Sequence, residues 1–370
     1  MKKVLFSILC LAMALWGLIG CVTPTKTVTT GEVGIEHETK FNSAYVLLTN
    51  DDMTEMGFAF GDSVNVVFSN GVNFEDIPYY NGYYVAKGEP LVCGYPGYPY
   101  IVVQENYASN FWGDHNLSES MTVTITLNEK AKYLKQQEAF SLKYSSDRAM
   151  YSTDEEFANF REIIAGDIKS GRLYRGASPV DNQYNRANYV DELIEEYNVH
   201  FILDLADSED DIESYKASRD MTNNYALKQE VVLLDMTADY MSETFKEKLG
   251  QGLIQMAKAD GNYFIHCTEG KDRTGFVCML LEALCGASYE EMRNDYMITY
   301  TNYYGIHSGD SQYEAVNELL FNDFCVNLLG TKDILNGDYV SAAKSYLKSC
   351  GMSDDNINEL VHRLADNRLY

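Results

Sequence analysis

The N-terminal part of the chain shows the spacing of strands rather than helices. Between residues 40 and 128, short runs rich in Val, Tyr and Thr are apolar or alternate with polar residues, as in strands with one buried face. Turn sequences such as Asn70-Gly71 and GYPGYP at 94–99 separate the runs. The pattern predicts a small all-β barrel or sandwich over residues 40–145, with strands at 43–49, 63–69, 100–104 and 121–127.

The pattern then changes to helices and buried strands. Residues 128–144 predict a helix with Asn128 as the N-cap candidate, and the polar stretch 145–156 predicts a linker. Beyond it, continuous apolar runs are typical of buried parallel strands, and they lie at 200–205, 231–234 and 263–266. Helical patterns between them, at 188–197 and 242–257, complete an alternation of strand and helix. We therefore predict an α/β domain over residues 157–370, with a parallel or mixed central sheet flanked by helices.

The first twenty residues resemble a bacterial signal peptide rather than part of the fold. A basic start precedes an apolar run, Val4 to Leu18, that is short for a membrane span. The run ends in LIGC at 18–21, which resembles a lipobox, where the Cys is lipidated and the preceding peptide is removed. We expect a signal peptide at 1–20, a lipid on Cys21, a tether at 21–39 and a location in the bacterial cell envelope, outside the cytoplasm. An ordinary signal peptide and an uncleaved anchor are the alternatives.

Charge and cysteine spacing narrow the classes of function. The 370 residues carry a net charge of −26, which argues against broad binding to nucleic acid or to anionic lipid. A local positive cavity can still bind a small anion. The eight cysteines show no zinc-type CxxC spacing, so we predict no metal site. Cys278 and Cys285 lie in an apolar helical pattern typical of buried free thiols, but the disulfide state of these two and of Cys93, Cys325 and Cys350 stays open.

One short stretch concentrates the residues that can carry chemistry. The sequence HCTEGKDRTG at 266–275 follows an apolar run and precedes a hydrophobic helical pattern at 275–284. A loop over 267–273 would lie at the carboxyl end of a strand and the amino end of a helix, where ligands bind in α/β folds. Backbone N–H groups and the helix dipole attract an anion there. Arg273 adds a planar guanidinium that can hold two phosphate oxygens.

A thiol at the start of such a loop is suited to phosphoryl transfer. Cysteines at positively polarised sites ionise more readily than exposed ones, and a thiolate facing a bound phosphate can attack phosphorus. Loop amides and Arg273 would stabilise the equatorial oxygens in the transition state. We expect Cys267 to be this nucleophile, Thr274 to donate its hydroxyl to Cys267, and His266 to orient the loop.

These residues match HC-x5-R, the signature of the cysteine-dependent protein tyrosine phosphatase superfamily, which the chain resembles. The GKDRTG form is similar to a bacterial branch that acts on both phosphoproteins and phosphoinositides. NFRE at 159–162, GRLYR at 171–175 and LDL at 203–205 also resemble family segments, although Ala206 stands where Arg is usual. The resemblance implies a tyrosine phosphatase-like fold, a cysteinyl-phosphate intermediate and no cofactor. It also implies substrate contacts from His266, Thr268, Glu269, Gly270, Lys271 and Thr274.

The resemblance further implies an Asp that protonates the leaving oxygen and then activates water. No WPD tripeptide is present. The loop after residues 231–234 offers Asp239 and Asp235, and we prefer Asp239 because it lies farther from the strand and can swing over the site. Asp272, inside the signature, is the third candidate. The structural alternatives are a helix cap for Asp239 or Asp235, and an ion pair with Lys271 or a nearby Arg for Asp272.

Lys271 bears on the choice of substrate. At the mouth of the site its charge would favour substrates with several phosphates, whereas a solvated surface lysine is the alternative. We predict a phosphatase that acts on phosphotyrosine proteins, phosphoinositides or inositol phosphates. The competing hypothesis is a surface protein that binds phosphorylated or glycan ligands without turnover.

Overall fold

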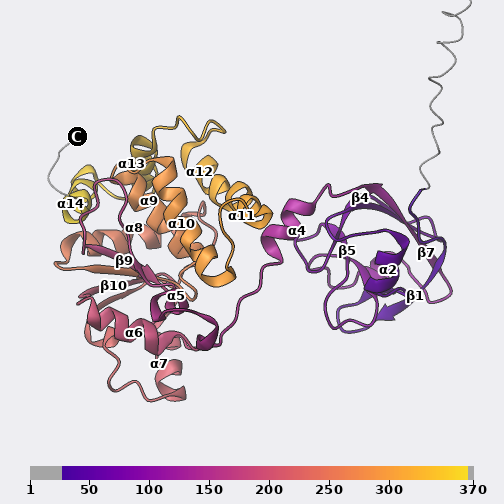
Figure 1. Ribbon diagram of the computed structural model, residues 1–370, viewed down its shortest axis with the longest axis horizontal. Coiled ribbons are helices and arrows are strands. Elements are labelled where there is room, and N and C mark those ends of the chain that lie inside the picture. Colours follow the sequence, from indigo (N-terminus) through magenta and orange to yellow (C-terminus); the bar gives the residue numbers. More distant parts are fainter. Residues whose placement is uncertain (1–26, 366–370) are drawn as a thin grey trace, which may run out of the picture. The chain divides into compact units, whose positions relative to one another are not determined.

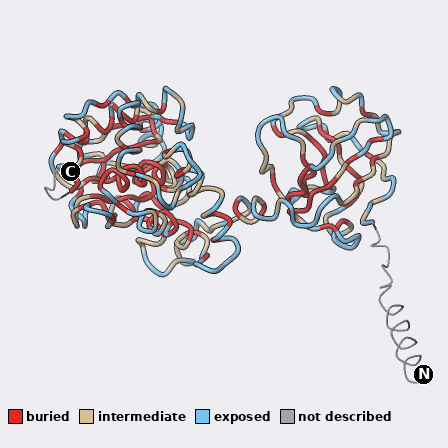
Figure 2. The backbone as a smooth tube through the Cα atoms, turned by 90° about the horizontal axis from the view of Figure 1, so that it is seen from above, coloured by how far each residue is buried: buried red, intermediate tan, exposed pale blue. Residues whose placement is uncertain are grey.

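The computed structural model describes residues 27–365, and the chain divides into two compact units, residues 1–137 and 138–370 (Figure 1). Each unit has its own buried interior (Figure 2). The predicted signal peptide at 1–20 and the lipidation site Cys21 lie outside the described residues. Among residues 27–365, no helix combines the length and apolar character needed to cross a membrane.

The first unit is a closed barrel with the strand order β1-β2-β6-β5-β4-β3-β7. Its strands are β1 Val33–Glu38, β2 Ser43–Val46, β3 Ser63–Phe68, β4 Asn73–Tyr80, β5 Pro90–Cys93, β6 Ile101–Glu105 and β7 Thr122–Glu129. Alternate side chains such as Val64 and Val66 are fully buried, as the period of two predicts. Two short helices, α2 (Asn50–Met56) and α3 (Phe111–Asp114), belong to this unit, so it is not all-β as predicted.

The boundaries of the barrel unit differ from the predicted ones. Strand β1 lies inside the range predicted as a tether, and it pairs with both β2 and β7. The predicted linker at 145–156 contains a 3-10 turn, η1 (Arg148–Met150), and the start of α5 (Asp154–Ala158), whereas the division between the units falls after residue 137. These short elements have too few residues to show a helical period in the sequence.

The predicted helix at 128–144 is also wrong in its first half. Strand β7 runs to Glu129 because Ser63 of β3 pairs with it there, and α4 covers only Leu134–Phe140. Asn128 is therefore a strand residue and no helix cap. Its Nδ2 donates to Ser63 Oγ at 3.0 Å.

The second unit is built on a five-stranded mixed sheet with the order β11-β10-β12-β9-β8. Strands β11, β10, β12 and β9 are parallel, and β8 runs antiparallel to β9. The bounds are β8 Arg161–Glu162, β9 Leu173–Gly176, β10 Phe201–Asp204, β11 Glu230–Leu233 and β12 Tyr263–His266. The three predicted apolar runs coincide with β10, β11 and β12 to within one residue at each end.

Helices cover both faces of this sheet (Figure 1). On one face Leu203 and Ile265 pack in a common core with α8 and α9, and on the other Ile202 and Phe264 pack with α6. The helices are α6 Ala187–Glu196, α7 Glu209–Ser218, α8 Glu243–Lys258, α9 Asp272–Leu284, α10 Tyr289–Tyr304, α11 Ser311–Val316, α12 Asn322–Leu329, α13 Tyr339–Ser349 and α14 Asp354–Leu364. A 3-10 turn, η2 (Ala226–Lys228), and a π-helical segment, η3 (Asn317–Phe321), complete the unit.

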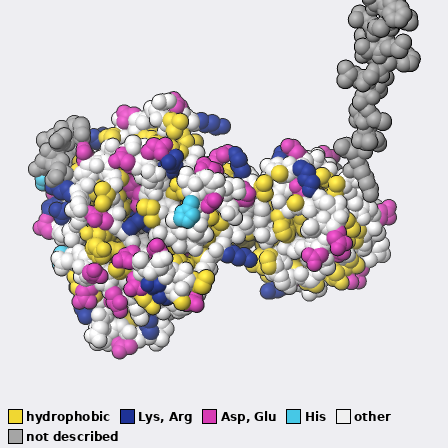
Figure 3. All heavy atoms as spheres, viewed as in Figure 1, with side chains coloured by type: hydrophobic (Ala, Val, Ile, Leu, Met, Phe, Trp, Pro, Cys, Tyr) yellow, Lys and Arg dark blue, Asp and Glu magenta, His cyan; other side chains and the backbone are white. Residues whose placement is uncertain are grey.

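The described cysteines are buried, whereas acidic side chains lie on the surface of both units. The six cysteines from Cys93 onward are free and buried, as expected for Cys278 and Cys285. Acidic side chains are spread over the visible face of each unit (Figure 3). Among the described residues, no group of three or more His, Cys, Asp or Glu is arranged to hold a metal ion.

Candidate active site

The signature HCTEGKDRTG forms the connection between β12 and α9. Helix α9 begins at Asp272, three residues earlier than the hydrophobic pattern predicted, so the loop itself is residues 267–271. Gly270 has φ +66°, and a Cβ there would lie 2.1 Å from the carbonyl oxygen of Gly176 at the end of β9. Only glycine combines this conformation with so close an approach. The loop therefore curls at the amino end of α9, where the helix dipole favours an anion.

A cavity of about 540 Å³ opens at this loop. Three segments that follow strand ends form its wall: the signature, the loop after β11 and the segment after β9. The lining residues are Tyr184, Met236, Thr237, Ala238, Cys267, Thr268, Glu269, Asp272 and Arg273. The structure thus brings together five of the predicted site residues. The loop after β11 was already expected near the site as a source of the acid. The carboxyl ends of parallel strands meet at one sheet edge, and this rule could also have identified the segment after β9, but not Tyr184 or Met236 individually.

Cys267, at the start of the loop, and Arg273, in the first turn of α9, line the same cavity. Cys267 is only 3% exposed. The Arg273 guanidinium is fixed on two sides, because Nη1 donates to the Met236 carbonyl at 2.8 Å and Nη2 to Thr268 Oγ1 at 3.4 Å. A thiol and a held guanidinium around one concavity can accommodate a tetrahedral oxyanion with its central atom near sulfur.

The three acid candidates occupy different places. Asp272 lines the cavity with about half of its side chain exposed, and burial of the carboxyl by surrounding protein raises its pKa. Asp239 is exposed and does not line the cavity, and its carbonyl accepts from Ser242 N and Oγ at the start of α8. Asp235 pairs with Lys248 at 3.2 Å. The preferred candidate, Asp239, is therefore not brought to the cavity in this structure.

Lys271 differs from both of its predicted roles. Its side chain is 18% exposed, and Nζ lies 3.1 Å from Glu269 Oε2 and 3.8 Å from Asp272 Oδ2. Burial opposes the charged form, but Asp272, Tyr304 and Glu269 outweigh it and raise the pKa of Lys271. The ammonium is thus neutralised by neighbouring acids and is absent from the cavity wall. It is neither a charge at the mouth nor a solvated surface lysine.

Glu269 is held in place from two sides. Its carboxylate accepts a hydrogen bond from the Tyr144 hydroxyl and forms an ion pair with Lys271. Burial alone would raise its pKa, but Lys271 and the Tyr144 hydroxyl lower the pKa below its usual value. Glu269 is therefore ionised at neutral pH, and its contacts with Tyr144 and Lys271 hold this part of the cavity wall.

His266 and Thr274 are buried beside the nucleophile candidate. His266 is 1% exposed, and its Nδ1 lies 3.3 Å from the carbonyl oxygen of Cys267, a contact in which the nitrogen must donate. Burial lowers the pKa of His266 to about 4, so the ring is neutral at pH 7. The Thr274 hydroxyl has no hydrogen-bond partner among the described residues, so the predicted bond to Cys267 is not formed.

A comparison with protein families gives a match that covers most of the second unit. The model of the Tyrosine phosphatase family matches residues 155–366, more than half of the chain. No curated protein matches the sequence significantly. Similar solved structures include the core catalytic domain of the PP-IP phosphatase SIW14 from S. cerevisiae, with 16% identity over 48% of this chain and 95% of that chain at a TM-score of 0.27. Another is P. aeruginosa TpbA, with 18% identity over 53% and 94% at a TM-score of 0.23. By the match of its family model, the chain belongs to the tyrosine phosphatase family.

Proposed function

We propose that the chain hydrolyses phosphate monoesters through a cysteinyl-phosphate on Cys267. The observation that carries the proposal is that Cys267 and Arg273 line one cavity at the amino end of α9. In the first step the sulfur attacks phosphorus and the bond from phosphorus to the ester oxygen breaks. In the second step water attacks phosphorus, the P–S bond breaks and phosphate leaves. Arg273 and the loop amides stabilise the charge on the equatorial oxygens.

Asp272 is the acid and base of this proposal. It lines the same cavity as Cys267, and its raised pKa keeps the carboxyl protonated to a higher pH than an exposed Asp. It donates its proton to the leaving ester oxygen in the first step and takes a proton from the attacking water in the second. Asp239 remains the alternative. Its loop would have to move for the carboxyl to reach the site.

The substrates of the proposal are phosphotyrosine proteins, phosphoinositides or inositol phosphates. Among the residues that line the cavity, Arg273 is the one cation, while Glu269 and Asp272 are acidic. The enclosed position of Lys271 removes the argument that it selects for several phosphates. The cavity charges therefore favour a substrate with a single phosphate over a polyphosphate.

Hydrolysis of para-nitrophenyl phosphate by the chain lacking residues 1–20 tests the proposal. We expect turnover without added metal and a fall of about three orders of magnitude or more in Cys267→Ser, since the nucleophile is lost. Inactivity of the wild type toward aryl phosphates, phosphoinositides and inositol hexakisphosphate would instead favour the binding protein.

We also propose that the protein is a lipid-anchored component of the cell envelope. The support is the sequence LIGC at 18–21. In cells fed a labelled fatty acid, the wild type should take up label and Cys21→Ala should not. Equal labelling of both would contradict the proposal.

A further inference from the structure

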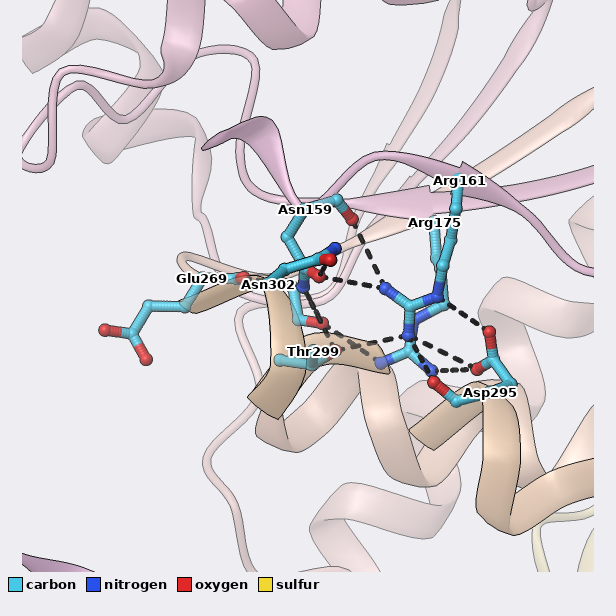
Figure 4. A network of polar contacts seen from close by, with 8 residues as sticks. Asn159, Arg161, Arg175, Glu269, Asp295, Thr299 and Asn302 are labelled. Carbon is cyan, nitrogen blue, oxygen red and sulfur yellow. Dashed lines mark hydrogen bonds and ion pairs between the residues drawn. The ribbon is translucent and has the colours of Figure 1, made fainter. Parts of the chain in front are cut away.

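Two main-chain carbonyls of the signature loop are held by a buried polar cluster (Figure 4). The Glu269 carbonyl accepts from the Tyr303 hydroxyl at 2.6 Å and from Asn159 Nδ2 at 3.5 Å. The Gly270 carbonyl accepts from Asn159 Nδ2 at 3.2 Å and from Arg175 Nη2 at 3.0 Å. None of the three donor residues lines the cavity. Both carbonyls therefore point away from the side where Cys267 and Arg273 meet.

The direction of a carbonyl fixes the direction of the next N–H. A trans peptide unit is planar, with its C=O and the following N–H on opposite sides. With the Glu269 and Gly270 carbonyls turned outward, the N–H groups of Gly270 and Lys271 turn toward the concave side of the loop. Among residues 27–365, neither of these N–H groups has a hydrogen-bond partner. They are free to donate to an anion.

The donors are themselves fixed by a second set of contacts. Asp295 Oδ1 accepts from Arg161 Nε at 2.7 Å, and Asp295 Oδ2 accepts from Arg175 Nη1 at 2.5 Å. Arg161 Nη1 donates to Asn159 Oδ1 at 2.9 Å, which leaves the amide NH₂ of Asn159 directed at the loop. Asn159 and Arg175 are 0% and 1% exposed. Buried groups with so many fixed partners have little freedom to rotate.

The cluster also carries net positive charge under the loop. Asp295 remains ionised, because Arg161 and Arg175 lower its pKa to about 2 although burial opposes this. Glu282, beside them, has its pKa raised well above the usual range by burial and by the Asp295 carboxylate, which favours its protonated form. Two guanidiniums, those of Arg161 and Arg175, pair with the one carboxylate of Asp295. The remaining positive charge favours an anion on the other side of the loop.

We propose that Asn159, Arg175 and Tyr303 are positioning residues that hold the Glu269 and Gly270 carbonyls outward, so that the N–H groups of Gly270 and Lys271 face the bound phosphoryl group. The inference rests on the proposed function for the identity of the anion. Asn159 lies in the NFRE segment and Arg175 in the GRLYR segment. The inference therefore assigns both segments a role in positioning the signature loop, which the sequence analysis did not include.

Binding of orthovanadate by calorimetry tests this, because it needs no turnover. In Asn159→Leu and Arg175→Met, we expect orthovanadate affinity to fall roughly tenfold or more, as for the loss of an oxyanion donor. The controls remove a matched side chain that donates to a carbonyl elsewhere in the unit: Asn224→Leu, which loses the bond to Pro179, and Arg172→Met, which loses the bond to Gly261. They should bind orthovanadate like the wild type.

Tyr303→Phe is a smaller change that still tests the inference if Asn159→Leu and Arg175→Met do not fold. It removes only the hydroxyl that donates to the Glu269 carbonyl, and Tyr263→Phe is its control, since the Tyr263 hydroxyl donates to Ala259. We expect weaker orthovanadate binding and a higher KM for para-nitrophenyl phosphate in Tyr303→Phe alone. Folded variants with wild-type affinity would overturn the inference, and so would a wild type that binds no orthovanadate. A wild type that binds orthovanadate without hydrolysing the ester would refute only the proposed function.

Discussion

At the residue scale, the choice between Asp272 and Asp239 as the acid can be decided by leaving groups. Phenyl phosphate needs a proton on its departing oxygen, whereas para-nitrophenolate leaves readily without one. In Asp272→Asn we expect kcat/KM for phenyl phosphate, which reports the first step alone, to fall by roughly 10²-fold or more, and kcat/KM for para-nitrophenyl phosphate to fall much less. The pKa of Asp272 is raised, and the acid must carry its proton to donate it. The wild-type kcat/KM for phenyl phosphate should therefore decline as pH rises through that pKa, and this decline should be absent in Asp272→Asn.

Asp239→Asn is the matched control, because its side chain does not line the cavity. Steady-state rates for both esters should stay close to wild type. The opposite ranking of the two variants would assign the acid to Asp239 and would require its loop to close over the bound substrate.

Asp207 permits a prediction about stability and pH. It is 4% exposed, accepts from the Tyr215 hydroxyl at 3.0 Å, and has its pKa raised to about 7 by burial and by Asp204. In the unfolded chain an Asp loses its proton near pH ~3.9. Between these pH values the folded state binds more protons, so this group lowers stability progressively as pH rises from about 4 to 7.

Asp207→Asn removes this penalty while keeping an acceptor for Tyr215. The unfolding free energy of the variant minus that of the wild type should increase by on the order of a few kcal/mol as pH rises from 4 to 7. Urea denaturation at the two pH values measures the difference, with the exposed Asp210→Asn on α7 as control. An unfolding free-energy difference between Asp207→Asn and wild type that does not change with pH would contradict the assignment.

At the scale of elements, the turn from β12 into α9 depends on Gly270. A Cβ at this position would meet the Gly176 carbonyl at 2.1 Å in a left-handed conformation. We expect Gly270→Ala to abolish orthovanadate binding and to lower stability by roughly 1–3 kcal/mol. Gly286→Ala is the control, because Gly286 has φ +81° and a Cβ there would have no atom within 4 Å, so only the backbone strain is added. Equal effects in the two variants would show that the close approach to β9 is unimportant.

The sequence was sufficient for elements whose pattern is local. The strands β10 and β12 are buried along their whole length and the edge strand β11 is partly buried, so their apolar runs marked them clearly. The signature is also a local pattern, and the structure places its Cys267 and Arg273 in the wall of one cavity. The helix predicted at 128–144 failed because pairing of β7 with β3, a tertiary contact, extends the strand to Glu129. The position of Asp239 and the partners of Lys271 also depend on how distant loops fold. The spacing of residues along the sequence does not predict such contacts.

At the scale of the whole molecule, the two units have separate cores. The barrel residues Val46, Val66 and Ile125 belong to one buried cluster, while Leu203 and Ile265 belong to another in the second unit. Every residue that lines the candidate cavity lies in the second unit. Domains with their own cores can generally fold alone.

A chain that begins at Leu134, the first residue of α4, should therefore keep the active site. We expect its kcat/KM for para-nitrophenyl phosphate to stay within about threefold of the full chain, since no cavity residue is removed. Calorimetry should show one unfolding transition for the shorter chain and two for the full chain, because each core melts as its own cooperative unit. If the shorter chain folds, as judged by circular dichroism, but loses activity, the barrel must support the signature loop, and the assignment of catalysis to the second unit alone would fail.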